Sequence, residues 1–321
     1  MSLQQLTFKS LILPDPDFQY LPEHLQDEYL VYFYKVNRKN NKEPTIKEPT
    51  IKEFAKLLAK FGLLTRLKKL LSQYDLTKHY NDFINAGFRD NQMEIVNYLV
   101  DLGGTIDYQE AINLAAIEGH RDLVFELIGL MEDLVFELAG LLKYPNYKSA
   151  MNEAAKGGHR NLVFELAALI EDPDYYRAMT NAVYGGHLDL VFELASLLEN
   201  PNYHWVMNNA AWTGHRDLVF ESAGLLENPD YQEAMDMAAH GGHRNLVFEL
   251  AGLMEDPEYE QAMDYAARRG HRDLVFELAG LMEDPNYQEA MYEAAEGGHQ
   301  DLVFELAGHL EEPDYQQAMN M

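Results

Sequence analysis

The chain of 321 residues has no cysteine, which excludes disulfides and thiolate metal sites. It also lacks an uncharged apolar run of about 18 residues that would cross a membrane as a helix. No N-terminal stretch has the order of a signal peptide, and no Asn-x-Ser/Thr acceptor occurs. These absences predict an intracellular location, most simply the cytoplasm.

Basic residues are scarce beyond residue 80. Residues 1–80 hold 13 Lys/Arg and 9 Asp/Glu, a balance of +4, whereas residues 81–321 hold 12 and 44, a balance of −32. Such acidity repels nucleic acid and anionic membranes and attracts basic proteins. We therefore expect no nucleic-acid or membrane partner, and a protein partner that is itself basic. The acidity also agrees with a simpler role, the solubility of a long repeat array.

Sequence signatures of catalysis and metal binding are missing as well. There is no phosphate-binding loop, dinucleotide fingerprint or His-Glu-x-x-His motif. Residues 215–218 match the start of a kinase catalytic loop, but the same letters recur at 120–123 and 271–274 without the later asparagine. His240 and His243 lack a third ligand, and helices packed 8–10 Å apart hold successive histidines too far apart to share one zinc. We expect no enzyme activity, no catalytic residue, no metal and no cofactor, and a structural histidine bonded to the inter-helix turn.

A short segment is repeated along most of the chain. Gly-His recurs first after 39 residues and then five times at intervals of 28, and Leu-Val-Phe-Glu follows each histidine after two intervening residues. A fixed period of this length is typical of stacked units, none of which buries its apolar side alone. The histidines are His120, His159, His187, His215, His243, His271 and His299.

One unit, taken from Asp256 to Glu283, reads as two helices. Asp256-Pro257 supplies an N-cap acceptor and a proline suited to the first helical position. The first helix ends at the glycine before His271, where a left-handed residue is favourable. The second begins at Arg272. The predicted apolar stripes are Tyr259, Ala262, Met263, Ala266 and Ala267 in the first helix, and Leu274, Val275, Leu278, Leu281 and Met282 in the second. The equivalent caps are Asp172, Asn200, Asn228 and Asp284, with Glu312 as an exception.

The phenylalanine of each unit is followed four residues later by a small residue. We predict that each ring lies over such a small residue, of its own or the next helix, and that the rings form a ladder. The alternative is a surface phenylalanine without a role. The small residues are Gly129, Gly140, Ala168, Ser196, Gly224, Gly252, Gly280 and Gly308.

Two short helices joined by Ala-Ala-x-Gly-Gly-His resemble an ankyrin repeat. Residues 91–120 are most similar to the divergent ankyrin-like repeats of large DNA viruses of amoebae, and the resemblance covers roughly residues 52–321. It implies an all-α, ankyrin-like solenoid of stacked antiparallel helix pairs, and a host-cell or virion location if the chain is viral. The units have 28 residues instead of about 33 and lack Thr-Pro-Leu-His, so we expect the β-hairpin fingers to be absent.

The domain organisation follows from where the repeat starts and stops. Residues 1–51 read as an N-terminal cap and a linker, because Lys-Glu-Pro-Thr-Ile occurs twice in 42–51. Residues 21–25, Leu-Pro-Glu-His-Leu, also permit an F-box-like interpretation. Residues 52–321 read as the repeat solenoid, with a half-unit at 315–321 that either covers the end of the stack or meets another chain.

The 39-residue interval contains an 11-residue insertion near 123–144. Eleven residues make about three helical turns, so the apolar stripe keeps its face. We predict one continuous helix from about Arg121 to Lys143. It would displace the following repeats or expose an apolar patch, which would be a contact site.

The positions at which the repeats disagree are the candidates for binding. They lie along one side of the first helix, which lines the concave surface of ankyrin-like stacks. Trp205 and Trp212, seven residues apart, share one side of one helix, and aromatic residues and arginine anchor protein interfaces. The leading hypothesis is a non-enzymatic scaffold that binds a protein partner there. The alternatives are a structural or self-assembling component, which would oligomerise through 121–144 or the C-terminal end, and simple drift of solvent-facing positions. The candidate residues are Tyr176, Arg177, Tyr184, His204, Trp205, Asn208, Trp212, His240 and Arg268.

Overall fold

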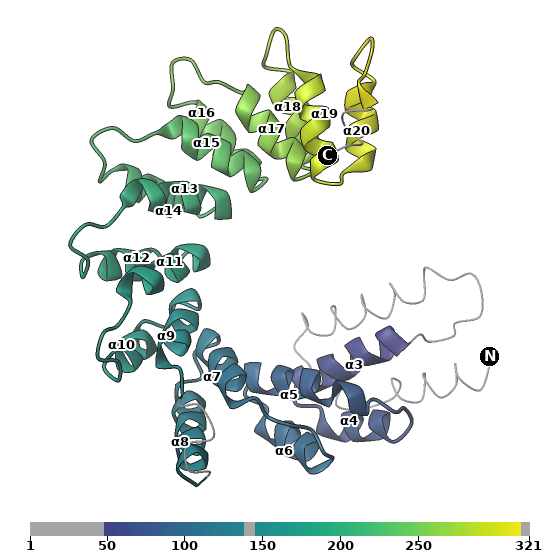
Figure 1. Cartoon of the computed structure of the whole chain (residues 1–321), viewed down its shortest axis with the longest axis vertical. Coiled ribbons are helices and arrows are strands. Elements are labelled where there is room, and N and C mark those ends of the chain that lie inside the picture. The colour runs from purple at the N-terminus through teal and green to yellow at the C-terminus, as the bar shows by residue number, and fades with distance from the viewer. Residues whose placement is uncertain (1–47, 138–144, 316–321) are drawn as a thin grey trace, which may run out of the picture. The chain divides into compact units, whose positions relative to one another are not determined.

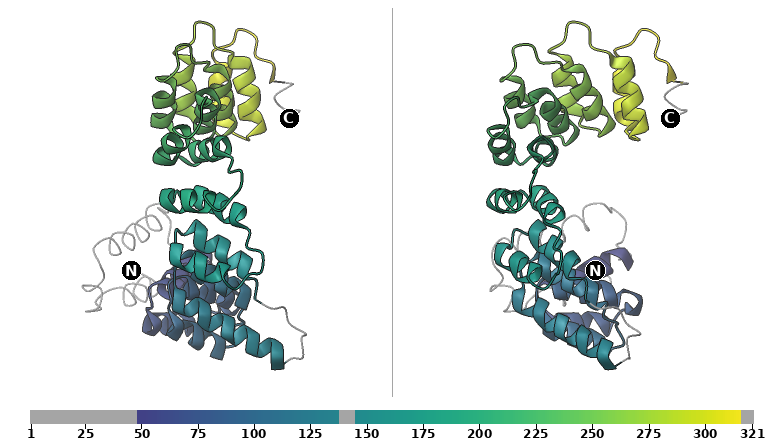
Figure 2. Two further views of the ribbon diagram at one scale, coloured as in Figure 1. Left: turned by 90° about the vertical axis from the view of Figure 1, so that its left-hand side faces the viewer. Right: turned by 60° about the vertical axis from the view of Figure 1, so that its left-hand side comes forward.

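The computed structural model describes residues 48–137 and 145–315, and this part of the chain is helical with no β-strand. Helices pack in consecutive pairs, which confirms the predicted all-α stack without hairpin fingers (Figures 1 and 2). The predicted N-terminal cap with its F-box-like segment, and the half-unit after Tyr315, lie outside the described residues. The chain divides into two compact units, Met1–Pro145 and Asn146–Met321.

Unit 1 contains three described helix pairs. Residues 48–51, which the repeated Lys-Glu-Pro-Thr-Ile predicts to be linker, instead form the first turn of α3, where Pro49 is tolerated because no helical N–H is needed there. The helices α3, α5 and α7 contact one another in series, and each carries its own second helix. The elements are α3 (Glu48–Lys60), α4 (Leu64–Leu71), the 3₁₀ helix η2 (Thr77–His79), α5 (Tyr80–Arg89), α6 (Met93–Asp101), α7 (Tyr108–Ile117) and α8 (Arg121–Glu137).

Unit 2 contains the regular 28-residue repeats. Its first helices pack on one another in a continuous layer, whereas each second helix packs chiefly on its own first helix. The first helices are α9 (Tyr147–Lys156), α11 (Tyr175–Gly185), α13 (Tyr203–Thr213), α15 (Tyr231–His240), α17 (Glu260–Arg268) and α19 (Tyr287–Glu296). The second helices are α10 (Arg160–Ala167), α12 (Leu188–Ala195), α14 (Arg216–Ala223), α16 (Arg244–Ala251), α18 (Arg272–Ala279) and α20 (Gln300–Ala307).

The core of unit 2 is built from the repeated apolar stripe. In α13 the side chains of Val206, Met207, Ala210 and Ala211 are fully buried, and the equivalent positions are buried in the other first helices of unit 2, except for the partly exposed Ala295 of α19. The alanines allow close approach of neighbouring helices, and burial of each larger side chain contributes roughly 1.5–3 kcal/mol. The predicted stripe of the second helix is partly wrong. Leu281 is 53% exposed, because α18 ends at Ala279 before another turn can carry residue 281 toward the core.

The N-caps lie two residues later than predicted. The chain passes through Asp172-Pro173, and Asp174 accepts the backbone N–H of Arg177 at 2.9 Å. The predicted cap and proline thus belong to the connection, where the Pro173 carbonyl accepts the Tyr175 N–H at 3.1 Å. Side-chain caps of this kind are Asp107, Asn146, Asp174, Asn202, Asp230 and Asn286.

The α17 repeat is the exception, and its sequence explains why. Position 258 is glutamate, whereas the other repeats of unit 2 have aspartate or asparagine at the equivalent position. Helix α17 begins one residue late, and Tyr259 at its cap position makes no side-chain hydrogen bond. The additional methylene of glutamate moves the carboxylate beyond the reach of the first-turn N–H groups.

Successive repeats are joined at the inter-helix turn by histidine and glycine. Gly270 ends α17 with φ +71°, as predicted, and the glycines at the same place in the other repeats are also left-handed. The His243 Nε2 atom lies 3.0 Å from the Trp212 carbonyl oxygen, 31 residues earlier, and the ring covers Gly214 so closely that a Cβ there would lie 2.5 Å from it. The predicted structural histidine is confirmed, with the difference that it bonds the turn of the preceding repeat. The other described pairs are His120–Arg89, His187–Lys156, His215–Tyr184, His271–His240 and His299–Arg268.

The predicted phenylalanine ladder is wrong. A Cβ added at Gly280 would meet only the carbonyl oxygens of Phe276 and Glu277, at 3.4 and 3.5 Å, and no ring atom within 4 Å. The Phe276 ring lies instead beneath the Arg272 guanidinium, 5.5 Å from its centroid, and Arg272 Nε reaches Glu305 of the next repeat at 2.6 Å. Arg160, Arg216 and Arg244 repeat this cation–π and ion-pair contact.

The insertion lengthens a helix, as predicted, as far as the structure describes it. α8 runs unbroken through the junction at residues 133–134 and has 17 residues, compared with eight in each second helix of unit 2. Leu130, on this additional length, is 44% exposed. Residues 138–144 lie outside the described residues, and the boundary between the two units follows directly after them. No described helix is long and apolar enough to cross a membrane.

Candidate partner-binding face

The first-helix layer of unit 2 has one side covered by the second helices and one side that is not covered by them, which we term the inner face. In α13 the fully buried residues are at positions 206, 207, 210 and 211, so Trp205, Asn208 and Trp212 lie on the other side of the helix. All three are partly exposed. The same three positions in each first helix carry the side chains that vary between repeats.

Aromatic rings form a continuous row across three first helices of the inner face, α11, α13 and α15. The ring of Tyr184 in α11 meets both tryptophans of α13, edge-on, with centroids 6.3 Å from Trp205 and 6.0 Å from Trp212. Tyr176 lies 6.2 Å from Trp205 at the other end of α11. Trp212 stacks on His240 of α15 at 6.2 Å. Such pairs contribute about 0.5–1.5 kcal/mol each beyond the apolar area they bury, so the row is held in one arrangement before any partner binds.

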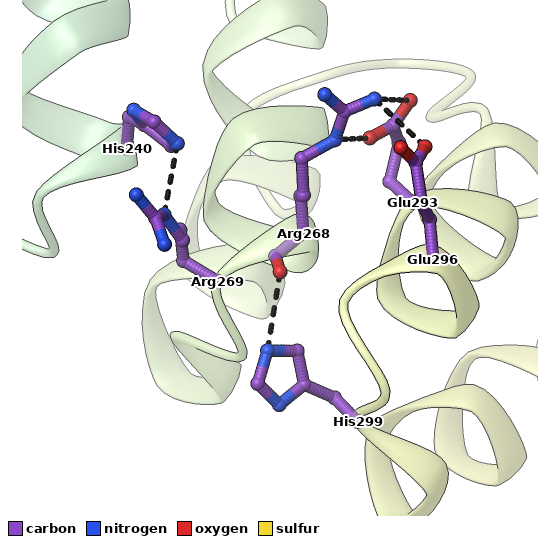
Figure 3. Close-up of polar contacts among 6 residues, drawn as sticks. All are labelled: His240, Arg268, Arg269, Glu293, Glu296 and His299. Atoms are coloured by element: carbon purple, nitrogen blue, oxygen red, sulfur yellow. Dashed lines mark hydrogen bonds and ion pairs between the residues drawn. The ribbon is translucent and has the colours of Figure 1, made fainter.

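His240 extends this row toward the charged side of the face. Its ring lies 5.4 Å from Tyr265 of α17, and its Nε2 accepts the Arg269 Nε–H at 2.9 Å (Figure 3). Burial, together with the positive charges of Arg269 and Arg268, lowers the pKa of His240 below its ordinary value. The ring is therefore a neutral acceptor at pH 7.

Arg268 is directed away from the aromatic row. Its guanidinium binds the carboxylates of Glu293 and Glu296 on α19, with Nη2 2.9 Å from Glu296 Oε2 (Figure 3). The hydrogen bond to Glu293 is the main reason why the pKa of Arg268 is raised. Its backbone carbonyl oxygen lies 3.1 Å from Nε2 of His299, in the following inter-helix turn. The side chain thus joins two repeats, and its charge is already compensated.

The structure brings together five of the nine predicted site residues in one set of ring contacts: Tyr176, Tyr184, Trp205, Trp212 and His240. Arg177 and His204 are exposed on the same two helices and take no part in those contacts. Asn208 lies between the two tryptophans along α13. Arg268 is separated from the row by its ion pairs with α19.

Sequence reasoning missed Tyr265, Asp236 and Asp264. Each occupies a position that varies between repeats, which was the available signal, but single carboxylates in an acidic chain do not stand out. Desolvation raises the pKa of Asp236 to about 7, opposed by a hydrogen bond from Gln232. Desolvation likewise raises the pKa of Asp264 to about 7, and the charges of Glu289 and Glu293 act in the same direction.

The turn histidines, such as His243 and His271, bond backbone carbonyls of preceding turns, and among the described residues no three His, Asp or Glu side chains are placed to hold a metal ion. Asp236 and Asp264, the two inner-face carboxyls whose pKa is raised to about 7, lie on different helices, and each has further acids nearby. An aromatic row next to partly buried acceptors is suited to noncovalent recognition.

No protein-family model matches this sequence, and no curated protein matches it significantly.

Proposed function

We propose that the protein is a non-enzymatic scaffold of ankyrin-like repeats that binds a protein partner on the inner face of unit 2. The observation that carries this proposal is the aromatic row from Tyr176 to His240. It places both tryptophans of the chain in one partly exposed cluster, on the face where the repeats differ. Partly exposed tryptophan and tyrosine held rigid by neighbouring rings supply contact area at low entropic cost, as interface anchors do.

The distribution of variation supports the same conclusion. The contacts that join the repeats use a constant set: the left-handed glycine, the histidine and the buried alanines. The inner face is aromatic in α11 and α13 and acidic in α15 and α19, where it carries Glu233, Asp236, Glu289 and Glu296. The repeats stack in the same way, but each presents different side chains on the inner face. An extended segment of a partner can therefore bind along this face in one defined alignment.

The test removes the rings without disturbing the frame. Trp205→Ala combined with Trp212→Ala should abolish partner capture in a pull-down from the native cell, with the helical circular-dichroism spectrum unchanged. The matched control is Leu197→Ala with Leu225→Ala, which removes two exposed apolar side chains from the ends of second helices in adjacent repeats. Retention of all partners by the tryptophan variant would refute the proposed function.

The long helix α8 favours a second candidate, a structural or self-assembling component. It is about twice as long as the second helices of unit 2 and carries Leu130 exposed on its additional length. A helix that extends beyond the length of its counterparts offers a second copy of the chain additional surface on which to pack. Light scattering distinguishes the two candidates, since this one requires a stable oligomer that Leu130→Glu dissociates, whereas a monomeric mass contradicts it.

A further inference from the structure

Three acceptor side chains occupy the same position in successive first helices of unit 2. They are Asn208 in α13, Asp236 in α15 and Asp264 in α17, 28 residues apart. Because α13 packs on α15 and α15 on α17, they form one column along the inner face, which we term the acceptor column.

The acceptor column is short of hydrogen-bond donors. The Oδ1 atoms of Asn208 and Asp264 are buried and have no hydrogen-bond partner. Asp236 is only 8% exposed and receives one bond, from Gln232 Nε2 at 3.2 Å. A buried acceptor left without a donor costs about 1–3 kcal/mol, so such groups in proteins are normally satisfied. Two of the three therefore lack a donor at one oxygen, and because Asn208 and Asp264 remain partly exposed, the rest of each side chain can meet a donor from outside the chain.

The nearby cations of the chain do not supply these donors. Arg268, four residues after Asp264 on α17, is bound by Glu293 and Glu296, and Arg269 donates to His240. Figure 3 shows both guanidinium groups directed to these partners. The groups that act electrostatically on Asp236 are acids, namely Asp230, Glu233 and Glu258. The column therefore lies in a negative surrounding whose own positive charges are engaged elsewhere.

The raised pKa values report the same imbalance. Burial raises the pKa of both Asp236 and Asp264 to about 7; no positive charge opposes it at Asp236, and Arg268 offsets only part of it at Asp264. A cation placed against them removes this cost.

Aromatic rings border one end of the column. Asn208 lies three residues after Trp205 and four before Trp212, so the three side chains share one side of α13. An arginine or lysine beside Asn208 would have an indole face within reach, which is the preferred aromatic surface for a cation.

We propose that the acceptor column, together with Trp205 and Trp212, binds arginine side chains of an extended segment of the partner protein. This inference rests on the proposed function and names the chemistry of the partner. Arginine fits better than lysine, because a planar guanidinium with five donors satisfies several acceptors at once and stacks on an aromatic face. Neighbouring helices lie about 8–10 Å apart and an extended chain advances about 3.3–3.6 Å per residue. Arginine at every third residue therefore meets successive helices.

The experiment uses the full chain and its own fluorescence, since Trp205 and Trp212 are the two tryptophans of the sequence. The probe is the peptide acetyl-(Arg-Gly-Ser)₄-amide, and its control has citrulline, a neutral isostere, in place of each arginine. We expect saturable change of the tryptophan emission with the arginine peptide and no saturation with the citrulline peptide. Asp236→Asn with Asp264→Asn should weaken binding at least about tenfold. Asparagine occupies this position in α9 and α13, so the variant keeps its fold.

A matched variant separates the site from general acidity. Asp172→Asn with Asp256→Asn removes two charges from exposed connections and should leave the dissociation constant within about twofold. The inference is overturned if the citrulline peptide binds equally well, if the two double variants weaken binding equally, or if the arginine peptide shows no saturable binding. These results leave the pull-down with the tryptophan variant unaffected, so the proposed function stands or falls separately.

Discussion

Replacement of Asp236 by asparagine should stabilise the protein in a pH-dependent way. Burial raises the pKa of this carboxyl from 3.8 to about 7, so the unfolded chain ionises it at lower pH than the folded protein does. Below about pH 4 both states are protonated and the raised pKa costs nothing. Between pH 4 and pH 7 the wild type loses about 1.4 kcal/mol of unfolding free energy per pH unit from this group, and above pH 7 the loss is constant.

The magnitude follows from that slope. Between pH 5 and pH 8 the wild type loses about 3 kcal/mol through Asp236, and the variant loses none, because asparagine does not titrate. The stabilisation by Asp236→Asn should therefore be about 3 kcal/mol larger at pH 8 than at pH 5. The amide oxygen still accepts the Gln232 bond, so little else changes.

The assay is urea denaturation at both pH values, followed by circular dichroism and by the emission of Trp205 and Trp212. The titration of the histidines, including His240 with its lowered pKa, is common to both proteins and cancels in the difference. Asp172→Asn, on an exposed connection, is the control and should show no such pH dependence. A stabilisation by Asp236→Asn that is equal at pH 5 and pH 8 would refute the reasoning.

Three further predictions concern the repeat frame. Gly242→Ala should lower the unfolding free energy by at least about 1–3 kcal/mol, because φ of Gly242 is +75° and a Cβ there would lie 2.5 Å from the His271 ring. The control is Gly280→Ala, where φ is −67° and only carbonyl oxygens lie nearby. It should leave the denaturation midpoint nearly unchanged or raise it. Glu258→Asp should restore the missing cap of α17 and add about 0.5–1 kcal/mol, measured by urea denaturation; no gain would contradict the explanation of the late helix start. Leu188→Arg should supply Phe192 with the arginine that four other repeats of unit 2 have and raise the melting temperature slightly. Arg216→Leu should lower the melting temperature only slightly, since the Arg216–Glu249 pair is exposed.

The architecture was predictable because it depends on residues that recur. The 28-residue interval, the paired apolar stripes and the Gly-His turn indicated stacked helix pairs, and the structure contains them in the described residues. The 11-residue insertion predicted a longer helix because its length matches whole turns, and α8 agrees as far as residue 137.

The errors arose where two neighbouring positions offered the same chemistry. Asp172-Pro173-Asp174 contains two possible caps, and the proline favoured the first by local propensity, although the second is the one whose carboxylate reaches a free N–H. Leu281 continues the apolar period, but α18 ends before it. Arg272, which covers Phe276, was visible four residues upstream of it, yet its bond to Glu305, 33 residues later, depends on how the repeats stack.

The candidate site was predictable in part. Variation between repeats located Trp205, Trp212 and their tyrosine neighbours, which the structure joins in one row. It did not distinguish Asp236 and Asp264 from the many other carboxylates, because burial and missing donors are properties of the folded stack.

Each turn histidine from His187 onward is bonded to the carbonyl 31 residues before it. This regular contact affects how the repeat array can evolve. From α11 onward, each hairpin of unit 2 is bonded to its predecessor through this histidine, so an in-frame gain or loss of 28 residues reconnects equivalent atoms and needs no new interface. The number of repeats can therefore change without any change in the residues that join them. The array can be extended by duplication of one hairpin, and the exposed residues of the new copy can then be substituted one at a time, while the contact between neighbouring repeats stays the same.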